Sequence, residues 1–279
     1  MGKRKNLLYF LQVLGYLILF TAFCGAAAIF AVFAGDKNGA HGFGILLRFA
    51  GKDPCAEDAS VLFENGDGLQ SAAKSGGYVY RVVVDPGHGG PDGGADGVRG
   101  ENEKTLNLSV AKKTASFLKL HGVDVVMTRE NDVWLADEDA KHKKHSDVEN
   151  RVKIGASSGA DAFVSIHMNS YPLESCSGLQ VFYGKKDGKS GVLAEKITSL
   201  VREKLQPGNR RVPKEDPGIY VLENAAGTAV LVECGFISNY DEAALLNDAA
   251  YQDKLAFVIA EAVFSFFTED RQQAIGSHE

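Results

Sequence analysis

The chain has little of several features that mark specialised classes of protein. Four cysteines in 279 residues are too few for a disulfide framework of the kind that holds small secreted domains together. An excess of positive charge is also missing, because 30 basic and 36 acidic side chains give a net charge of −6. This balance excludes a general nucleic-acid-binding protein, which would be basic over its binding face. The remaining composition, 45% hydrophobic and 24% charged, is typical of a globular protein.

The hydrophobic residues are concentrated at the N-terminus. Residues 7–34 contain no charged side chain and follow the basic run Lys3-Arg4-Lys5. As a helix they would span about 42 Å, more than the roughly 30 Å of a bilayer core, whereas the apolar part of a cleavable signal peptide has only about 7–15 residues. The pattern predicts that residues 1–35 form a membrane anchor whose basic end is cytoplasmic, with the rest of the chain extracytoplasmic. Cleavage near Val32-Phe33-Ala34 followed by secretion is the alternative.

The remainder of the chain divides by composition. Residues 36–78 are rich in Gly, Ser, Ala, Asp and Lys and are predicted to be an extracytoplasmic linker. Residues 79–268 alternate between strand and helix patterns, and residues 269–279 are predicted to be a flexible tail. The predicted strands are 78–85, 122–129, 162–168, 178–184, 218–222 and 229–236, and the predicted helices are 104–120, 147–157, 192–205 and 251–267. This alternation predicts a single layered α/β domain, with a central mostly parallel or mixed sheet of about six strands flanked by helices.

A glycine-rich turn follows the first strand of that domain. It reads DPGHGGPDGGADG from Asp85 and joins the end of a strand to the start of a helix, where α/β sheets bind ligands. A dinucleotide fingerprint is excluded because Asp92 stands where the third glycine would be. The glycines instead let the backbone turn tightly around His88 and leave its imidazole exposed at the edge of the sheet.

A second histidine, His167, lies at the end of another predicted strand, in the segment SIHMNS. Two imidazoles and a carboxylate suit Zn²⁺, and three protein ligands leave one coordination position open for water. The third ligand could be Glu103 or Glu101, since the glycine-rich turn returns both to the start of the following helix. The sequence therefore predicts a metal site at this edge of the sheet.

A carboxylate interrupts the apolar strand that ends in LVECGF. Glu233 would be costly to bury without a partner, so the pattern predicts a paired, protonated or functional side chain. Beside a metal site, such a carboxylate is suited to act as a general base and acid. A serine nucleophile at Ser157 is excluded, because its G-x-S-x-G pattern follows a helix rather than a strand. Cys234, next to Glu233, is expected to face the core.

These segments together resemble the zinc-dependent N-acetylmuramoyl-L-alanine amidases of the amidase_3 type. The resemblance rests on DPGHGGPDGGADG, Glu103-Lys104, SIHMNS and VECGFISNYDEAALL, and it covers about two thirds of the chain. It implies that His88, Glu103 and His167 hold one zinc ion per chain and that Glu233 is the catalytic acid and base. The Glu-Lys pair of the family favours Glu103 over Glu101. Asn169 is expected to help orient the substrate.

Within that family, the chain is similar to the germination-specific amidases of the spore cortex. The similarity rests on MTREND (127–132) followed by a long polar loop, on one N-terminal hydrophobic segment and on the lack of visible wall-binding repeats. It implies hydrolysis of the amide between N-acetylmuramic acid and L-alanine in peptidoglycan, during cortex maturation for germination. The missing wall-binding module suggests a partner protein that targets or activates the enzyme.

Two other functions are left as alternatives. One is a different zinc hydrolase of the cell envelope, a deacetylase or a carboxypeptidase, and the other is a non-catalytic wall-binding protein. A disulfide between Cys55 and Cys176 also remains open.

Overall fold

The computed structural model describes residues 80–186 and 188–276, together with the residue pairs 29–30 and 46–47. The chain divides into two units, Met1–Gly77 and Tyr78–Glu279. In the first unit, β1 (Ile29–Phe30) pairs antiparallel with β2 (Leu46–Leu47). The strands, helices and candidate site described below all belong to the second unit.

The structure corrects the prediction of a membrane helix over residues 7–34. Ile29 and Phe30 lie inside that segment and form a strand, and a residue paired in a strand cannot belong to a continuous helix. The other residues of the predicted anchor lie outside the described residues. Across the part of the chain that the structure describes, no helix combines the length and apolar character needed to cross a bilayer. The membrane-anchored localisation predicted from the sequence is therefore wrong.

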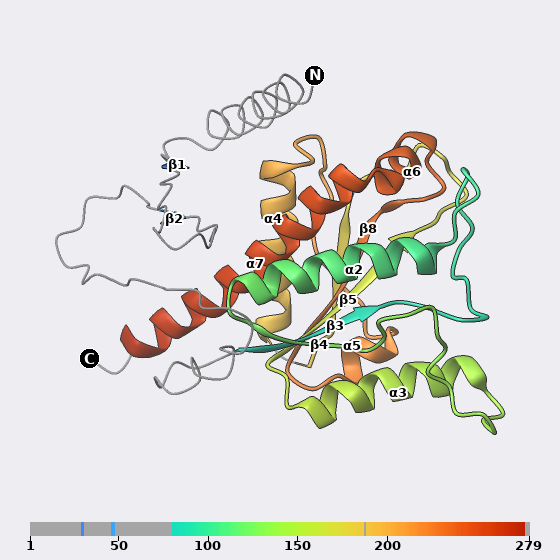
Figure 1. Ribbon diagram of the computed structural model, residues 1–279, viewed down its shortest axis with the longest axis horizontal. Helices are drawn as coiled ribbons and strands as arrows, with labels where there is room; N and C mark the ends of the chain where they lie inside the picture. Colours follow the sequence, from blue (N-terminus) through green and yellow to red (C-terminus); the bar gives the residue numbers. More distant parts are fainter. Residues whose placement is uncertain (1–28, 31–45, 48–79, 187, 277–279) are drawn as a thin grey trace, which may run out of the picture. The chain divides into compact units, whose positions relative to one another are not determined.

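A six-stranded mixed sheet forms the centre of the second unit (Figure 1). Its strands are β3 (Arg81–Pro86), β4 (Asp124–Met127), β5 (Ala162–Asn169), β6 (Gln180–Tyr183), β7 (Lys214–Glu215) and β8 (Thr228–Phe236). They lie in the order β4-β3-β5-β8-β6-β7, and only the pairing of β6 with β8 is antiparallel. The parallel strands β3, β5 and β8 are neighbours, so their carboxyl ends meet at one edge of the sheet.

Helices cover both faces of this sheet (Figure 1). They are α2 (Glu103–Leu120), α3 (Lys143–Ser158), α4 (Gly188–Lys204), α5 (Tyr220–Asn224), α6 (Tyr240–Asn247) and α7 (Ala249–Gly276). Successive residues of a strand point to opposite faces. Val82 and Val84 therefore pack with α2, α4 and α7, whereas Val83 packs with α3 and α5. The predicted α/β domain with a mixed sheet of about six strands flanked by helices is confirmed.

One predicted strand is a helix in the structure. Residues 218–222 were expected to be extended, but Tyr220–Asn224 form α5, which buries Val221 and Leu222 against the sheet. A short apolar run has no periodicity that separates a buried strand from a buried helix, so its conformation is decided by tertiary packing. The sixth strand is supplied instead by β7.

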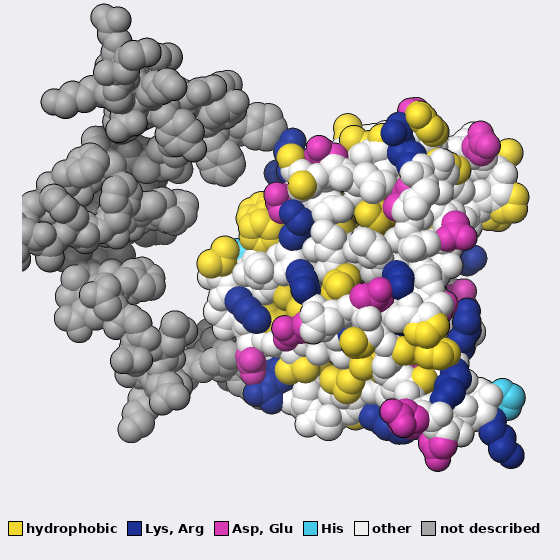
Figure 2. All heavy atoms as spheres, turned by 45° about the vertical axis from the view of Figure 1, so that its right-hand side comes forward, with side chains coloured by type: hydrophobic (Ala, Val, Ile, Leu, Met, Phe, Trp, Pro, Cys, Tyr) yellow, Lys and Arg dark blue, Asp and Glu magenta, His cyan; other side chains and the backbone are white. Residues whose placement is uncertain are grey.

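Several large hydrophobic side chains are exposed near the carboxyl ends of β5 and β8. Tyr171 is 55% exposed, Leu173 59% and Tyr240 62%. On the face drawn in Figure 2, hydrophobic side chains lie scattered among basic and acidic ones and do not gather in one region. Charged side chains of both signs therefore lie between the exposed hydrophobic ones on this face.

Candidate active site

The residues singled out in the sequence meet at the carboxyl ends of β3, β5 and β8. His88 follows β3 by two residues, His167 lies near the end of β5, and Glu233 lies in β8 directly beside His167 in the strand register. Glu103 is the first residue of α2. Parallel pairing of the strands and the return of the chain through α2 therefore bring together side chains that are up to 145 residues apart.

Three of these side chains form a cluster that could hold a metal ion. One ligand atom from each of His88, Glu103 and His167 lies within 4.8 Å of the other two. Nε2 of His88 is 3.2 Å from Oε2 of Glu103, and Nδ1 of His167 is 2.9 Å from Oε1 of Glu103. The cluster contains Glu103 and not the alternative Glu101.

Close approach of the backbone to this cluster requires glycine at two positions. A Cβ atom on Gly87 would lie 2.2 Å from the imidazole of His167, and a Cβ on Gly94 would lie 2.5 Å from Oε2 of Glu103. Gly94 also has a φ of +71°, a conformation that L side chains rarely adopt. The glycine-rich turn is thus shaped around the imidazole and the carboxylate rather than around a phosphate.

Glu103 is buried but supplied with hydrogen-bond donors. Its Oε1 accepts from the backbone N–H of Met168 and from Nδ2 of Asn107, both at 3.2 Å, and its Oε2 accepts from the backbone N–H of Ala95 at 2.9 Å. Burial alone would raise the pKa of Glu103, but hydrogen bonds and charge interactions with His167 and His88 hold it well below its ordinary value. This carboxylate stays ionised.

His88 is oriented by a second carboxylate. Its Nδ1 lies 2.9 Å from Oδ2 of Asp92. In a neutral ring, the proton on Nδ1 is donated to Asp92, which leaves the lone pair of Nε2 directed towards Glu103 and the cluster. Burial would lower the pKa of His88, but Glu103 and Asp92 raise it to about 9. Without a metal, the site therefore binds a proton on His88. This indicates a negative potential that favours a cation.

Glu233 has the opposite surroundings. Its Oε2 is shielded from solvent and has no hydrogen-bond partner among the described residues. Burial raises the pKa of Glu233 to about 7; His167 and His88 act to lower it and Glu103 to raise it. A carboxyl group that titrates near neutral pH can both accept and release a proton under physiological conditions.

A buried ionic network beneath the turn was not predicted from the sequence. Arg151 in α3 forms ion pairs of 2.7 Å with Asp85 at the end of β3 and with Asp147 one helical turn away. Thr128 and Ser165 donate the remaining hydrogen bonds to Asp85, at 2.6 and 2.7 Å. These three charged residues are each at most 4% exposed. The only sequence signal for the network was an aspartate that closes an apolar strand.

Two arginines of this region hold the backbone that carries His88. Arg151 donates to the carbonyl oxygens of Pro86 and His88, and Arg129 donates to those of Pro86 and Gly87. His88 itself has a φ of 60°, unusual for a residue other than glycine. The arginines therefore fix a strained backbone so that the imidazole points into the cluster.

The other singled-out residues have simpler surroundings. The side chain of Asn169, at the end of β5, is part-exposed and has no hydrogen-bond partner in the described part of the chain, so it is available to a ligand. Cys234 is fully buried on the opposite face from Glu233, as expected. Ser157 lies in α3. The pairing of Cys55 with Cys176 is not described, because Cys55 lies outside the described residues.

Residues 82–265 match the Amidase_3 family, described as N-acetylmuramoyl-L-alanine amidase. The chain therefore belongs to this family of amidases, which act on peptidoglycan.

Individual relatives agree with this membership. The chain is 39% identical over 212 residues to the germination-specific N-acetylmuramoyl-L-alanine amidase of Bacillus subtilis, covering 74% of this chain and 87% of that protein. It is 31% identical to the N-acetylmuramoyl-L-alanine amidase AmiA of Escherichia coli, covering 76% of this chain and 84% of that protein. Among solved structures, it resembles the CwlD amidase of Clostridioides difficile in complex with the GerS lipoprotein, with 33% identity and a TM-score of 0.65 over 68% of this chain and 98% of that chain.

Proposed function

We propose that the protein is a zinc-dependent amidase that hydrolyses the bond between the lactyl group of N-acetylmuramic acid and L-alanine. In this proposal His88, Glu103 and His167 hold one zinc ion, Glu233 transfers protons and Asn169 orients the substrate. Residues 79–268 form the catalytic domain. The observation that carries the proposal is a cluster of two imidazoles and an ionised carboxylate beside a carboxyl group whose pKa is raised to about 7.

The donor set fits zinc. Nitrogen and oxygen donors from two histidines and one glutamate are a common set for catalytic zinc, and Asp92 supplies the carboxylate that orients such a histidine. When bound, the metal would polarise the scissile carbonyl and lower the pKa of the attacking water. Glu103 fits the ligand role because the two imidazoles hold its pKa well below the ordinary value, which favours the ionised form that binds a cation.

Glu233 carries the proton in the proposed reaction. Oε2 has no competing partner among the described residues, so it is available to accept a proton from the attacking water. The same atom then donates that proton to the nitrogen of L-alanine as the carbon–nitrogen bond breaks. The stem peptide leaves as a free amine, and the muramic acid keeps a carboxylate.

The decisive experiment is mass spectrometry of peptidoglycan treated with the zinc-loaded full-length chain. We expect glycan strands whose lactyl groups end in free carboxylates, together with intact stem peptides that begin with a free L-alanine amine. A chelator should abolish these products and added zinc should restore them. Release of acetate would instead identify a deacetylase, release of terminal amino acids a carboxypeptidase, and binding without products a wall-binding protein.

We further propose a role in spore cortex maturation with a protein partner. The support is the similarity to a germination-specific amidase and to an amidase solved in complex with a lipoprotein. Deletion of the gene in its host should leave cortex muramic acid fully substituted with stem peptides, without an effect on vegetative growth. Co-purification of a lipoprotein with the full-length chain would identify the partner, and an active, monomeric enzyme that binds no lipoprotein would contradict that part.

A further inference from the structure

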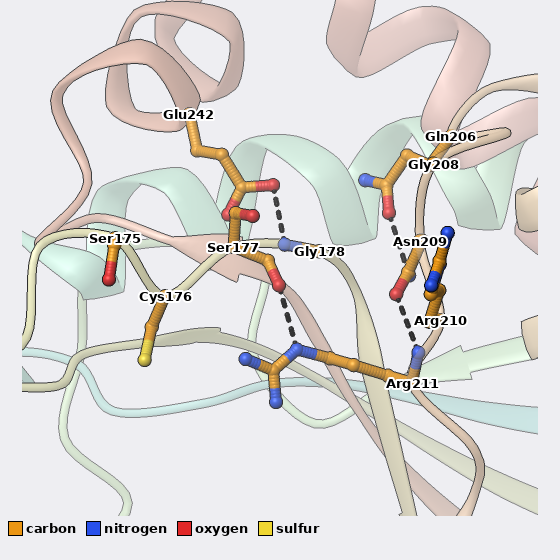
Figure 3. A pocket seen from close by; sticks show the side chains of 10 residues that line it. All are labelled: Ser175, Cys176, Ser177, Gly178, Gln206, Gly208, Asn209, Arg210, Arg211 and Glu242. Carbon is orange, nitrogen blue, oxygen red and sulfur yellow. Dashed lines mark hydrogen bonds between the residues drawn. The ribbon is translucent and has the colours of Figure 1, made fainter.

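A pocket of about 600 Å³ opens at the same edge of the sheet as the candidate active site, and none of the roles assigned above uses it. Figure 3 shows its lining, formed by the segment before β6, the segment between α4 and β7, and the start of α6. The lining includes Ser177, Gly178, Asn209, Arg211 and Glu242. A pocket of this volume is large enough for several atoms of a peptide.

The strand that follows the first lining segment of the pocket, β6, pairs with β8, which carries Glu233. Gln180, two residues after Gly178, is the strand partner of Glu233. Phe236 ends β8 three residues after Glu233, and its ring lies 4.5 Å from the guanidinium carbon of Arg211. The pocket therefore borders the strand that carries Glu233, at the same edge of the sheet.

Arg211 is fixed in a position from which it can bind an anion. Its Nε donates to the carbonyl of Ser177 at 2.7 Å, and its backbone N–H donates to Oδ1 of Asn209 at 3.0 Å. Figure 3 shows the side chain extended along the pocket towards Ser177. The two terminal nitrogens of Arg211 have no hydrogen-bond partner among the described residues. A guanidinium held at Nε and with both terminal nitrogens free matches the two oxygens of a carboxylate.

The acidic side chain of the pocket is already engaged. Glu242 accepts from the backbone N–H of Gly178 with Oε1 and from that of Phe236 with Oε2, both at 2.8 Å. Burial raises the pKa of Glu242, which limits the negative charge that it presents. Arg210, which is exposed, adds a second positive charge to the lining. The pocket is therefore positive where Arg211 lies.

We propose that this pocket binds a carboxylate of the stem peptide through Arg211 while the amide bond is cleaved at Glu233. The proposal rests on the proposed function, which supplies the peptide. The stem peptide is the leaving group, it extends away from the scissile nitrogen, and it ends in a carboxylate. Arg211 would contribute specificity for that peptide without contacting the reacting atoms.

The test compares two soluble muropeptides with the same sugars and the same stem, one with free peptide carboxylates and one with these groups amidated. The zinc-loaded wild type should cleave the free form with a kcat/KM at least about tenfold higher, the size expected for a charge-assisted hydrogen bond. Arg211→Gln should lose this factor on the free form, mainly through KM, and should leave the amidated form unchanged. Arg211→Lys should recover part of the preference. Lys153→Gln, which removes one positive charge from the exposed side of α3, is the matched control and should change neither value.

Two results would overturn the proposal. One is a wild type that cleaves both substrates equally well, and the other is an Arg211→Gln variant that loses the same factor on both, as a merely structural role would give. Calorimetric titration with the isolated stem peptide and its amidated form separates this proposal from the function on which it rests. Carboxylate-dependent binding that Arg211→Gln removes supports the pocket even where no amidase products form, and equal binding of both peptides contradicts it.

Discussion

Two glutamates in one site show how surroundings divide the roles of a single residue type. Glu103, at the start of α2, accepts three hydrogen bonds from Met168, Asn107 and Ala95, and its pKa lies well below the ordinary value. Glu233, within β8, has an oxygen without a partner among the described residues, and its pKa is raised to about 7. Both carboxylates are buried, but hydrogen bonds and charge interactions with His167 and His88 outweigh the burial of Glu103, whereas burial prevails at Glu233. The surroundings of Glu103 favour a permanent charge, and those of Glu233 favour a carboxyl group that gains and loses its charge near neutral pH.

Removing the permanent charge has the largest expected effect. Glu103→Ala deletes the carboxylate that joins the two imidazoles, so the purified variant should contain no stoichiometric zinc. Activity should fall by at least about 10³-fold, because both the activation of water and the polarisation of the carbonyl are lost. Elemental analysis and a muropeptide assay measure the two effects. Glu101→Ala is the control, since it lies outside the cluster; zinc retained by Glu103→Ala, or lost from Glu101→Ala, would contradict the assignment.

The second-largest effect is expected from breaking the buried ionic network of Arg151, Asp85 and Asp147 beneath the glycine-rich turn. Arg151→Met leaves Asp85 and Asp147 buried without their cation, which costs about 3–5 kcal/mol of unfolding free energy. Urea unfolding at pH 7 measures this loss. Arg81→Met is a useful comparison, because its ion pair with Asp124 is nearly half exposed and should be worth at most about 1 kcal/mol. Equal losses in the two variants would show that the buried network does not support the turn.

Replacing Glu233, whose Oε2 has no hydrogen-bond partner among the described residues, should raise the free energy of unfolding rather than lower it. In the metal-free protein, the pKa of Glu233 is about 7 when folded and near 4.5 when unfolded, so its protonated form stabilises the fold fully below about pH 4.5 and this stabilisation is lost as the pH rises through 7. The amide side chain of the Glu233→Gln variant does not ionise. Metal-free Glu233→Gln should therefore be more stable than the wild type by about 3 kcal/mol at pH 8, and about equally stable at pH 4.

Denaturant unfolding of both metal-free proteins at the two pH values measures this difference. A variant that is less stable than the wild type at pH 8 would show that Glu233 is not poorly solvated in the folded state. Saturating zinc should reduce the advantage of the variant, because the cation lowers the pKa of a nearby carboxyl.

The smallest expected effect concerns the orientation of His88. Asp92→Asn keeps the shape of the partner of Nδ1 but removes its charge, and loss of such a partner weakens metal binding by about 10–100-fold. Turnover at saturating zinc should change much less. A zinc titration followed by activity separates the two. Unchanged zinc affinity would show that the turn alone fixes the imidazole.

The residues that meet at the candidate site could be predicted because each lies in a short segment with a distinctive pattern. His167 and Glu233 lie within apolar strands and His88 closely follows one, and Asp92 excludes a dinucleotide fingerprint in the turn around His88. The buried ionic network of Asp85, Asp147 and Arg151 could not be predicted, because Asp85 and Arg151 are 66 residues apart and meet only when α3 packs on the sheet. Residues 218–222 were misassigned for the same reason: an apolar run is compatible with a strand or a helix until its packing is known.

The proposed function assigns metal binding to Glu103 and proton transfer to Glu233, so the two properties should be separable. Zinc content and amidase turnover should be measured on one preparation of Glu233→Gln at pH 7, beside the wild type. We predict one zinc per chain in both proteins and a loss of turnover of about 10²–10⁴-fold in the variant, the usual contribution of a general acid and base. A variant that binds zinc and turns over at the wild-type rate would contradict the role of Glu233, and a variant that loses zinc would contradict the division of roles between the two glutamates.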